Sequence, residues 1–205
     1  MGSESAPIFV RKFFPPVRRR AVAARGATFA CALLAASPVA TLAQGPQGAA
    51  TFPVGIKELD YVDPHEGGRH LTLRVFYPAA IRERSATPFV LPFFTKLNLY
   101  KDAEAADSEK RPLVVFSHGR GSNGLYYAWF AEFLASHGYI VAALNHYRAN
   151  TYDSTIAYLA NKLWQRPRDV ALSISVLLND PVWGKSIDAN RIGVAGHSQG
   201  GFTAL

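Results

Sequence analysis

The sequence predicts an α/β fold, with a mostly parallel central sheet and helices on both of its faces. Apolar runs of strand length alternate along the chain with segments of helical periodicity, which favours right-handed strand–helix–strand units. A second observation is the pattern Gly-x-Ser-x-Gly at 196–200, which stands between an apolar run and the start of a helical segment. The 205 residues, 49% of them hydrophobic, are enough for one globular domain.

Residues 1–43 have the composition of an export signal. They hold six of the chain's 22 basic residues and one of its 15 acidic ones, and a short alanine-rich run follows the last positive charge. Pro38 ends this run, and Thr41-Leu-Ala43 offers small residues at the cleavage positions. We therefore expect cleavage near Ala43 and export to the periplasm or beyond. An uncleaved anchor is the alternative, for which the apolar run is short.

The remaining residues, 44–205, exclude several classes of protein. Their basic and acidic residues nearly balance, so the net charge of +7 belongs mostly to the leader and leaves no basic surface for a nucleic acid. Cys31, inside the leader, is the only cysteine, which leaves the mature chain without a disulfide or a thiolate metal site. No cluster of His, Asp and Glu has metal-ligand spacing, and we expect neither a metal nor a cofactor.

The first strands are expected at 55–62 and 70–77, in an antiparallel hairpin closed by Gly67-Gly68. Residues 79–111 follow as a long irregular excursion, apolar in its first half and charged in its second. The excursion is either a flap over an apolar substrate or a surface segment pinned by its own aromatic residues. Its length favours the second interpretation, because long loops in compact domains are only sometimes functional.

Three more strands are expected at 112–117, 139–144 and 191–195. The first two are continuous apolar runs, which is typical of strands buried on both faces. Helices are expected at 126–136, 156–164 and 167–178 from their apolar spacing. The first helix is expected to bury its apolar side, formed by Tyr126, Trp129, Phe130, Phe133 and Leu134.

The turn at 196–200 predicts a nucleophile elbow, in which Ser198 is exposed on a sharp strand-to-helix turn. Side chains at Gly196 and Gly200 would collide with neighbouring backbone in so tight a turn. The alternative is an ordinary glycine-rich turn between a strand and a helix. The flanking strand and helix favour the elbow.

The histidines and acids near these strands leave several roles open. His118, in the glycine-rich turn after residue 117, is expected to brace that turn rather than to act as a base. His197 is expected to pack on the far side of the elbow, while His146 either lines the pocket or is a solvated loop residue. Asp169 is expected to pair with a neighbouring arginine, Arg166 or Arg168, or to serve the first turn of its helix.

Four stretches of this chain carry a family resemblance: Arg74-Val-Phe-Tyr-Pro78, Val115-Phe-Ser-His-Gly-Arg-Gly121, Trp164-Gln-Arg-Pro-Arg-Asp169 and 188–201. Together they resemble the α/β-hydrolase superfamily. Within it, the chain is most similar to the dienelactone-hydrolase-like and platelet-activating-factor-acetylhydrolase-like serine esterases. True dienelactone hydrolases use a cysteine where this chain has Ser198, so dienelactone is not the expected substrate.

The resemblance implies both a mechanism and a fold. Ser198 would be the nucleophile, and the backbone N–H groups of Arg120 and Gln199 would bind the oxyanion, with His118, Gly119, Gly196 and Gly200 as structural support. The implied strand order is 1-2-4-3-5-6-7-8, of which this chain supplies strands 1 to 5. The acid and the histidine follow the serine in this fold, so both are expected beyond Leu205 and residues 44–205 are expected to be the N-terminal part of the domain.

The resemblance also implies a substrate class, namely a small-molecule or lipid-like carboxylic ester. A membrane is expected to be met only through the export signal. Two other readings stay open. One is a non-catalytic binding protein with the same fold, and the other is an amidase or acyltransferase on the same scaffold.

Overall fold

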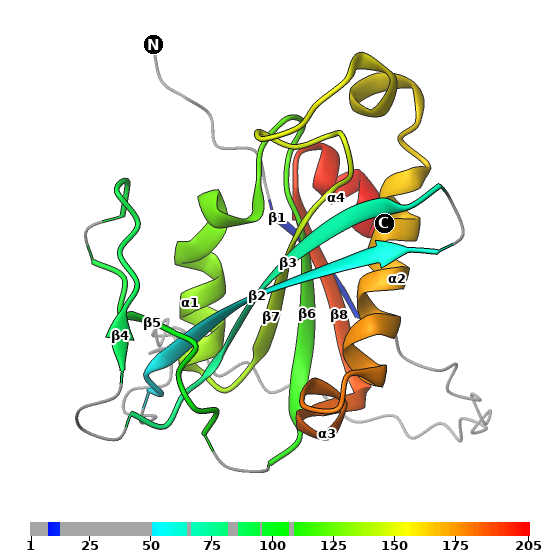
Figure 1. The fold of residues 1–205 in the computed structure, drawn as a ribbon. Helices are drawn as coiled ribbons and strands as arrows, with labels where there is room; N and C mark the ends of the chain where they lie inside the picture. The colour runs from blue at the N-terminus through cyan, green and yellow to red at the C-terminus, as the bar shows by residue number, and fades with distance from the viewer. Residues whose placement is uncertain (1–7, 13–50, 65–66, 82–85, 95, 107–108) are drawn as a thin grey trace, which may run out of the picture. The chain divides into compact units, whose positions relative to one another are not determined.

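The computed structural model describes residues 8–12, 51–64, 67–81, 86–94, 96–106 and 109–205. Within these ranges the strands form one mixed sheet of eight, in the order β1-β8-β6-β7-β3-β2-β5-β4 (Figure 1). Helix α1 (Ala128–Ser136) covers one face of this sheet, while α2 (Gln165–Asn179) and the short α3 (Trp183–Ser186) cover the other. The α/β class predicted from the alternation of strands and helices is confirmed.

The five expected strands are all present. They are β2 (Val54–Asp63), β3 (Arg69–Pro78), β6 (Arg111–Ser117), β7 (Ile140–Asn145) and β8 (Ile187–His197). β2 and β3 form the antiparallel hairpin, from Val54 opposite Pro78 to Asp63 opposite Arg69. β6 is parallel to both of its neighbours, β7 and β8. Counted in the expected numbering, the order is 1-2-4-3-5, as the resemblance implied.

Strand β1 (Ile8–Lys12) was not expected, because it falls within the predicted export signal. It pairs antiparallel with β8, from Ile8 opposite His197 to Lys12 opposite Gly193. In the implied order, the fifth of five strands would be an edge, and the 191–195 strand was expected to be one in residues 44–205. Because β1 pairs with it, β8 is not the edge of the sheet in this chain. The export signal itself stays a prediction, and most of residues 1–43 lie outside the described ranges.

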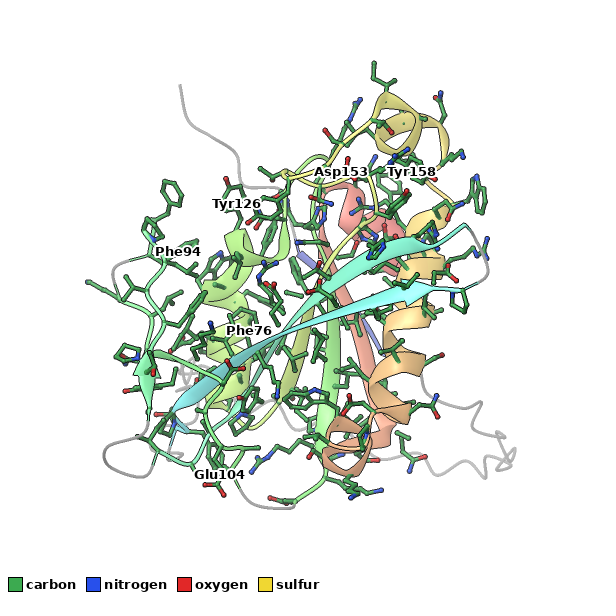
Figure 2. All side chains as sticks on the ribbon, viewed as in Figure 1. Phe76, Phe94, Glu104, Tyr126, Asp153 and Tyr158 are labelled. Carbon is green, nitrogen blue, oxygen red and sulfur yellow. The ribbon has the colours of Figure 1, made fainter. Side chains whose placement is uncertain are left out.

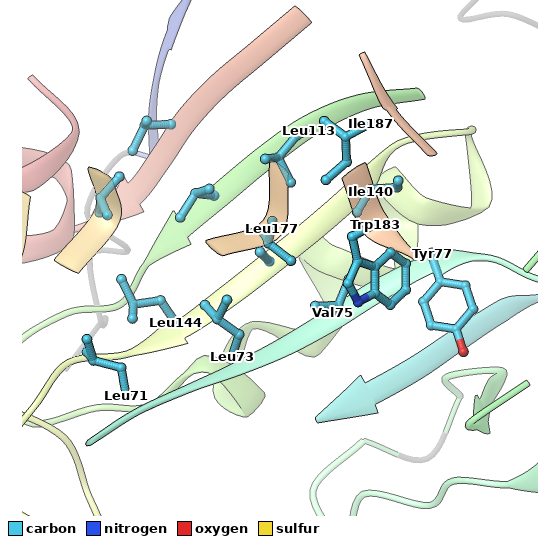
Figure 3. Packing of buried hydrophobic residues seen from close by; sticks show 14 of the residues in the cluster. Leu71, Leu73, Val75, Tyr77, Leu113, Ile140, Leu144, Leu177, Trp183 and Ile187 are labelled. Carbon is cyan, nitrogen blue, oxygen red and sulfur yellow. The ribbon is translucent and has the colours of Figure 1, made fainter. Parts of the chain in front are cut away.

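Each face of the sheet has its own apolar core because side chains alternate along the strands. On the face of α2, side chains of β3, β6 and β7 pack against the two helices and against Ile187 (Figure 3). Trp183 of α3 lies edge-on to Tyr77, with 5.0 Å between the ring centroids. On the other face Phe76 and Phe116 pack against α1. The two cores hold the central strands, and with them the loops at their carboxyl ends.

The buried face of α1 differs from the expected one. Its three alanines, Ala128, Ala131 and Ala135, face the sheet and are at most 1% exposed. Trp129 and Phe133, expected to be buried, are 46% and 58% exposed. Small residues let the helix approach the sheet closely, which moves the large aromatic residues to its flanks. Phe130 and Leu134 still pack partly against the core.

The excursion after β3 contains two short strands, β4 (Thr87–Pro88) and β5 (Leu99–Lys101). β5 extends the sheet beside β2, and Leu99 is buried in the core. These strands lie at the edge of the sheet opposite β1. The ring of Phe93 stands edge-on to that of Tyr126, with 6.4 Å between the ring centroids. Figure 2 labels Tyr126 and Phe94, the residue that follows Phe93. The excursion is thus attached by its own apolar residues.

The remaining elements follow β6 and β7. A 3₁₀ turn, η1 (Gly124–Tyr127), leads into α1, and a single π-helical turn, η2 (Ala157–Asn161), replaces the helix expected at 156–164. Helix α4 (Gln199–Ala204) begins directly after Ser198. None of the helices in the described ranges is long and apolar enough to cross a membrane.

Candidate active site

Ser198 stands at the turn between β8 and α4 with a backbone conformation that few L-residues adopt. Its φ is 53° and its ψ is −119°, and the residue is exposed. Such strain persists only where the surrounding structure holds it, and it is found most often at functional sites. A Cβ on Gly196 would overlap the carbonyl oxygen of Gly200, and one on Gly200 would overlap that of Ser117. The elbow is therefore packed backbone to backbone against the end of β6.

A pocket of about 550 Å³ opens beside Ser198. Arg120 and Gln199, the two residues whose N–H groups the resemblance assigns to the oxyanion, line it together with Ser198. The rest of its lining is mainly apolar, with one buried arginine. These residues are Leu163, Arg166, Pro167, Phe202 and Thr203.

The turn that carries Arg120 follows β6 and lies next to the elbow, because Ser117 is opposite Gly196 in the parallel pair β6–β8. After Gly121 the chain turns into η1, whose N-cap is Asn123. The side-chain oxygen of Asn123 accepts hydrogen bonds from the backbone N–H groups of Leu125 and Tyr126. The cap satisfies donors that the turn would otherwise leave open. It thereby fixes where the turn ends.

The segment between β7 and α2 is tied to both parts of the site. Gln199 Nε2 donates to the carbonyl of Leu159 at 3.1 Å, which joins η2 to the elbow. Thr151 Oγ1 donates to the carbonyl of Gly121 at 2.9 Å, which joins the same segment to the turn after β6. Asp153 and Tyr158, labelled in Figure 2, lie on this segment at the end of the sheet where α4 begins.

Two of the histidines weighed in the sequence contact the turn and the elbow without reaching Ser198. His118 is fully buried, and its Nδ1 lies 2.7 Å from the carbonyl oxygen of Gly119. Burial, and next the proximity of His146, hold the pKa of His118 well below its usual range. His197 Nδ1 lies 3.0 Å from the hydroxyl of Tyr127, which also accepts from the N–H of Gly119 at 3.4 Å.

A second arrangement of Ser, His and Asp lies beneath the turn, and sequence reasoning missed it. Ser117 Oγ is 2.8 Å from His146 Nε2, and His146 Nδ1 is 2.9 Å from Asp169 Oδ2. All three residues are buried, with at most 1% exposure. A signal existed, because Ser117 is the last residue of β6 and His146 directly follows β7, and the carboxyl ends of these neighbouring parallel strands meet at one edge of the sheet.

His146 and Asp169 therefore differ from both expectations held for them. His146 is neither a pocket residue nor a solvated one, because its exposure is 0%. Asp169 forms its ion pairs with Arg69, at 2.9 Å, and with His146, and the charge of Arg166 acts on it without such a contact. Arg69 precedes the exposed His70 in the sequence and could not be paired with α2 before the register of the hairpin was known.

Four charged side chains share this buried region: Arg69, Asp63, Asp169 and Arg166. Arg69 Nη2 binds Asp63 at 2.6 Å, so the opposite charges are paired as buried charges must be. Burial raises the pKa of Asp169 to about 7, with the charge and hydrogen bond of Arg69 acting in the opposite direction. Burial, followed by the charges of Arg166 and Arg69, holds the pKa of His146 well below its usual range, so the ring is neutral at neutral pH.

Arg166 joins this region to the pocket. It is 2% exposed, and its Nη2 donates to the carbonyl of His118 and to Ser117 Oγ, the latter at 3.2 Å. Its Nε donates to Thr203 Oγ1 of α4 at 3.2 Å. Burial lowers the pKa of Arg166 to about 10, which leaves the guanidinium charged at neutral pH. No group of three or more His, Cys, Asp or Glu in the described part of the chain could hold a metal ion.

Residues 94–174 match the family described as platelet-activating factor acetylhydrolase, isoform II. This segment includes the turn after β6 and the side chains Ser117, His146 and Asp169, whereas the elbow lies outside it. Curated relatives from three mammals carry the name platelet-activating factor acetylhydrolase. The one from Bos taurus is 25% identical over 228 residues, covering 78% of this chain and 51% of its own. The one from Cavia porcellus is 31% identical over 137 residues, covering 47% and 31%.

A solved structure with the same arrangement is a ferulic acid esterase from Streptomyces cinnamoneus. The TM-score is 0.59 and the sequence identity is 28%, over 78% of this chain and 56% of the esterase. This chain thus spans about half the length of the relatives it matches.

Proposed function

Because this chain belongs to an α/β-hydrolase family of esterases, we propose that it contributes the nucleophile and the oxyanion hole of a carboxylic ester hydrolase. The observation that carries the proposal is the backbone of Ser198. A serine with a φ of 53° at a strand-to-helix turn, exposed to a pocket, is the geometry of a nucleophile elbow. A binding protein with no chemistry to perform would have no need to maintain this strain.

In the proposed reaction Ser198 Oγ attacks the carbonyl carbon of the ester and its proton passes to a base. The backbone N–H groups of Arg120 and Gln199 hold the negative oxygen of the tetrahedral intermediate. The intermediate collapses with loss of the alcohol, which leaves an acyl group on Ser198. Water then attacks this acyl-enzyme and releases the acid. Gln199 is the first residue of α4, and the positive end of the helix dipole at this N-terminus favours developing negative charge.

The proposed base is a histidine from the part of the relatives' length that this chain does not span, and so is the acid that orients it. The contacts of the described histidines support this placement. His118 Nδ1 is engaged with Gly119, His197 with Tyr127, and His146 with Ser117 and Asp169. In enzymes of this fold the acid and the histidine follow the serine along the chain.

The lining of the pocket supports a substrate with an apolar part. Leu163, Pro167 and Phe202 surround the approach to Ser198 and can contact an acyl chain or an aromatic ring. The relatives act, by name, on platelet-activating factor and on ferulic acid esters. A small-molecule or lipid-like ester is accordingly the proposed substrate class, with neither a metal nor a cofactor in the reaction.

The proposed site of action lies outside the cytoplasm, after removal of residues 1–43. This part of the proposal rests on the order of a basic region, an apolar run and Thr41-Leu-Ala43 in the sequence. The N-terminal sequence of the protein recovered from outside the cytoplasm tests it. A mature protein that begins near Met1 would contradict it.

The experiment uses the full-length protein, that is, this chain with its native downstream sequence. A fluorophosphonate probe is expected to label it, and short p-nitrophenyl esters are expected to be hydrolysed, with both activities abolished by Ser198→Ala. The probe also separates the two open readings, because a non-catalytic binding protein is not labelled. An amidase or acyltransferase would be labelled but would prefer an amide or a second acceptor to water. Labelling that survives Ser198→Ala would show that the nucleophile lies elsewhere.

A further inference from the structure

Arg166 contacts both elements that carry the proposed oxyanion donors, and it does so with one guanidinium. Nη2 donates to the carbonyl of His118, two residues before Arg120 in the turn after β6. Nε donates at 3.2 Å to Thr203 Oγ1 on α4, and that hydroxyl donates in turn to the carbonyl of Gln199 at 3.0 Å. The side chain therefore lies between the supports of the two N–H groups.

Arg166 is itself held in place by the buried Ser117, His146 and Asp169. Ser117 Oγ accepts from Arg166 Nη2 at 3.2 Å and lies 2.8 Å from His146 Nε2. When Nδ1 of the neutral His146 donates a hydrogen bond to the carboxylate of Asp169, Nε2 can accept a hydrogen bond from the hydroxyl of Ser117. Asp169 stands one turn after Arg166 on α2 and is fixed by Arg69. The three side chains act here as a scaffold, because none of them is open to a substrate.

We propose that Arg166 is a positioning residue, which sets the separation of the Arg120 and Gln199 N–H groups that form the oxyanion hole. Two donors stabilise an oxyanion only when both lie about 2.7–3.1 Å from the same oxygen. Here they belong to different elements, so a contact common to both elements determines whether they converge. The inference rests on the proposed function and extends it to a residue outside the elbow and the turn.

Lysine at this position keeps the positive charge, but its three N–H donors share one nitrogen, so it cannot reproduce the contacts that Arg166 makes from two separate nitrogens, Nε and Nη2. Arg166→Lys in the full-length protein is therefore expected to lower kcat for p-nitrophenyl acetate by about 10–100-fold, less than the 10²–10³-fold loss that follows removal of an oxyanion donor. KM is expected to change less than about threefold, because the donors act on the transition state. Arg168→Lys is the matched control, two residues along α2 with an exposed side chain, and is expected to behave as the unmodified protein.

Inhibition separates positioning from general loss of structure. A trifluoromethyl ketone forms a tetrahedral adduct whose oxygen occupies the oxyanion hole, whereas the matched secondary alcohol fills the pocket without forming one. In Arg166→Lys the Ki of the ketone is expected to rise by about the factor lost in kcat/KM, while the Ki of the alcohol stays within about threefold. Titration with the fluorophosphonate probe counts the folded active sites and corrects kcat. A rise in both Ki values by the same factor, or a loss of kcat that the titration explains, would overturn the inference.

Thr203→Val provides a second, milder variant that removes the acceptor of Arg166 Nε and leaves the arginine in place. Its kcat is expected to fall several-fold with little change in KM. If Arg166→Lys does not fold, a Thr203→Val enzyme with unchanged kcat and unchanged ketone Ki refutes the inference. These outcomes are distinct from failure of the proposed function, which is decided by Ser198→Ala alone.

Discussion

The hydroxyl of Ser117 lies 2.8 Å from Nε2 of His146, and Asp169 lies 2.9 Å from Nδ1 of the same ring. The three groups have the order and spacing of a catalytic triad, yet Ser117 is fully buried at the end of a regular strand. Ser198 has the strained backbone and the pocket but no such partner within the described residues. Backbone conformation and access, rather than a Ser–His contact, are therefore the grounds on which Ser198 and not Ser117 is proposed as the nucleophile.

The first prediction separates these two serines. Peptide mapping of the full-length protein after fluorophosphonate labelling is expected to find the adduct on Ser198 and none on Ser117. Ser117→Ala is expected to leave labelling at Ser198 detectable, while the free energy of unfolding falls by about 1–3 kcal/mol because His146 and Arg166 lose a buried partner. An adduct on Ser117 would mean that the buried side chains are reached by opening of the turn.

The second prediction concerns stability and pH. The folded-state pKa values of His118 and His146 are depressed, so the stability they contribute is present above pH 6.5 and is lost as the pH falls below it. The pKa of Asp169 is raised from 3.8 to about 7, so its contribution has the opposite sign and is lost as the pH rises from about 4 to about 7. As the pH falls, the stability lost through the two imidazoles exceeds the stability gained through the one carboxyl. We expect a net loss of stability between pH 6.5 and 5, approaching about 1.4 kcal/mol per pH unit.

Urea unfolding of the protein at several pH values between 5 and 7 measures this slope. His118→Asn removes one of the two imidazoles without touching the contacts of Asp169, and is expected to bring the slope close to zero. His70→Asn, at an exposed position of β3, is the control and should keep the slope of the unmodified protein. A slope that is unchanged in His118→Asn would show that the buried imidazole is not what makes acid destabilising.

A third prediction follows from the contact between the elbow and β6. A Cβ at Gly200 overlaps the carbonyl oxygen of Ser117, and backbone cannot move aside as a flexible side chain does. Gly200→Ala is expected to lower the free energy of unfolding by about 3 kcal/mol or more and to abolish labelling of Ser198. Gly67→Asn is the matched control. Gly67 has a φ of 63°, a conformation that Asn tolerates, and a Cβ at this position would have no neighbouring atom within 4 Å. The free energy of unfolding is therefore expected to change by no more than about 1 kcal/mol.

The two innermost strands could be placed because 112–117 and 139–144 are continuous apolar runs, and the strand order could be predicted because the resemblance supplied it. The elbow could be placed for a similar reason, since its glycines and flanks are local in the sequence. The prediction of the buried face of α1 was wrong, because hydrophobicity alone favours burial of Trp129 over burial of Ala131. Closeness of approach to the sheet decides which of the two is buried, and this cannot be deduced from one helix alone.

The contacts of Asp169 and Arg166 could not be predicted, because their partners come from β3, from the ends of β6 and β7, and from α4. They depend on how the strands are paired rather than on spacing along the chain. Strand β1 was missed for a different reason, since a segment read as an export signal was excluded from the fold.

The pairing of β1 with β8 leads to the last prediction. β8 carries the elbow, and β1 covers its outer edge over residues 193–197. Removal of residues 1–43 would leave the N–H and C=O groups of that edge open, and open edges pair with other chains. Residues 44–205 expressed alone are therefore expected to aggregate more than residues 1–205 at the same concentration, and to hydrolyse esters no faster than their Ser198→Ala variant.

Proline tests whether the pairing itself is responsible, because it cannot donate to a ladder of hydrogen bonds. Successive N–H groups of a strand point to opposite sides, so replacing both Phe9 and Val10 by proline removes one donor toward β8 whatever the register. This double variant of residues 1–205 is expected to aggregate like residues 44–205, as measured by light scattering and thioflavin T fluorescence. Replacing the same two residues by threonine keeps both N–H groups and is the control. Equal solubility of the proline and threonine variants would show that β1 does not protect the edge of β8.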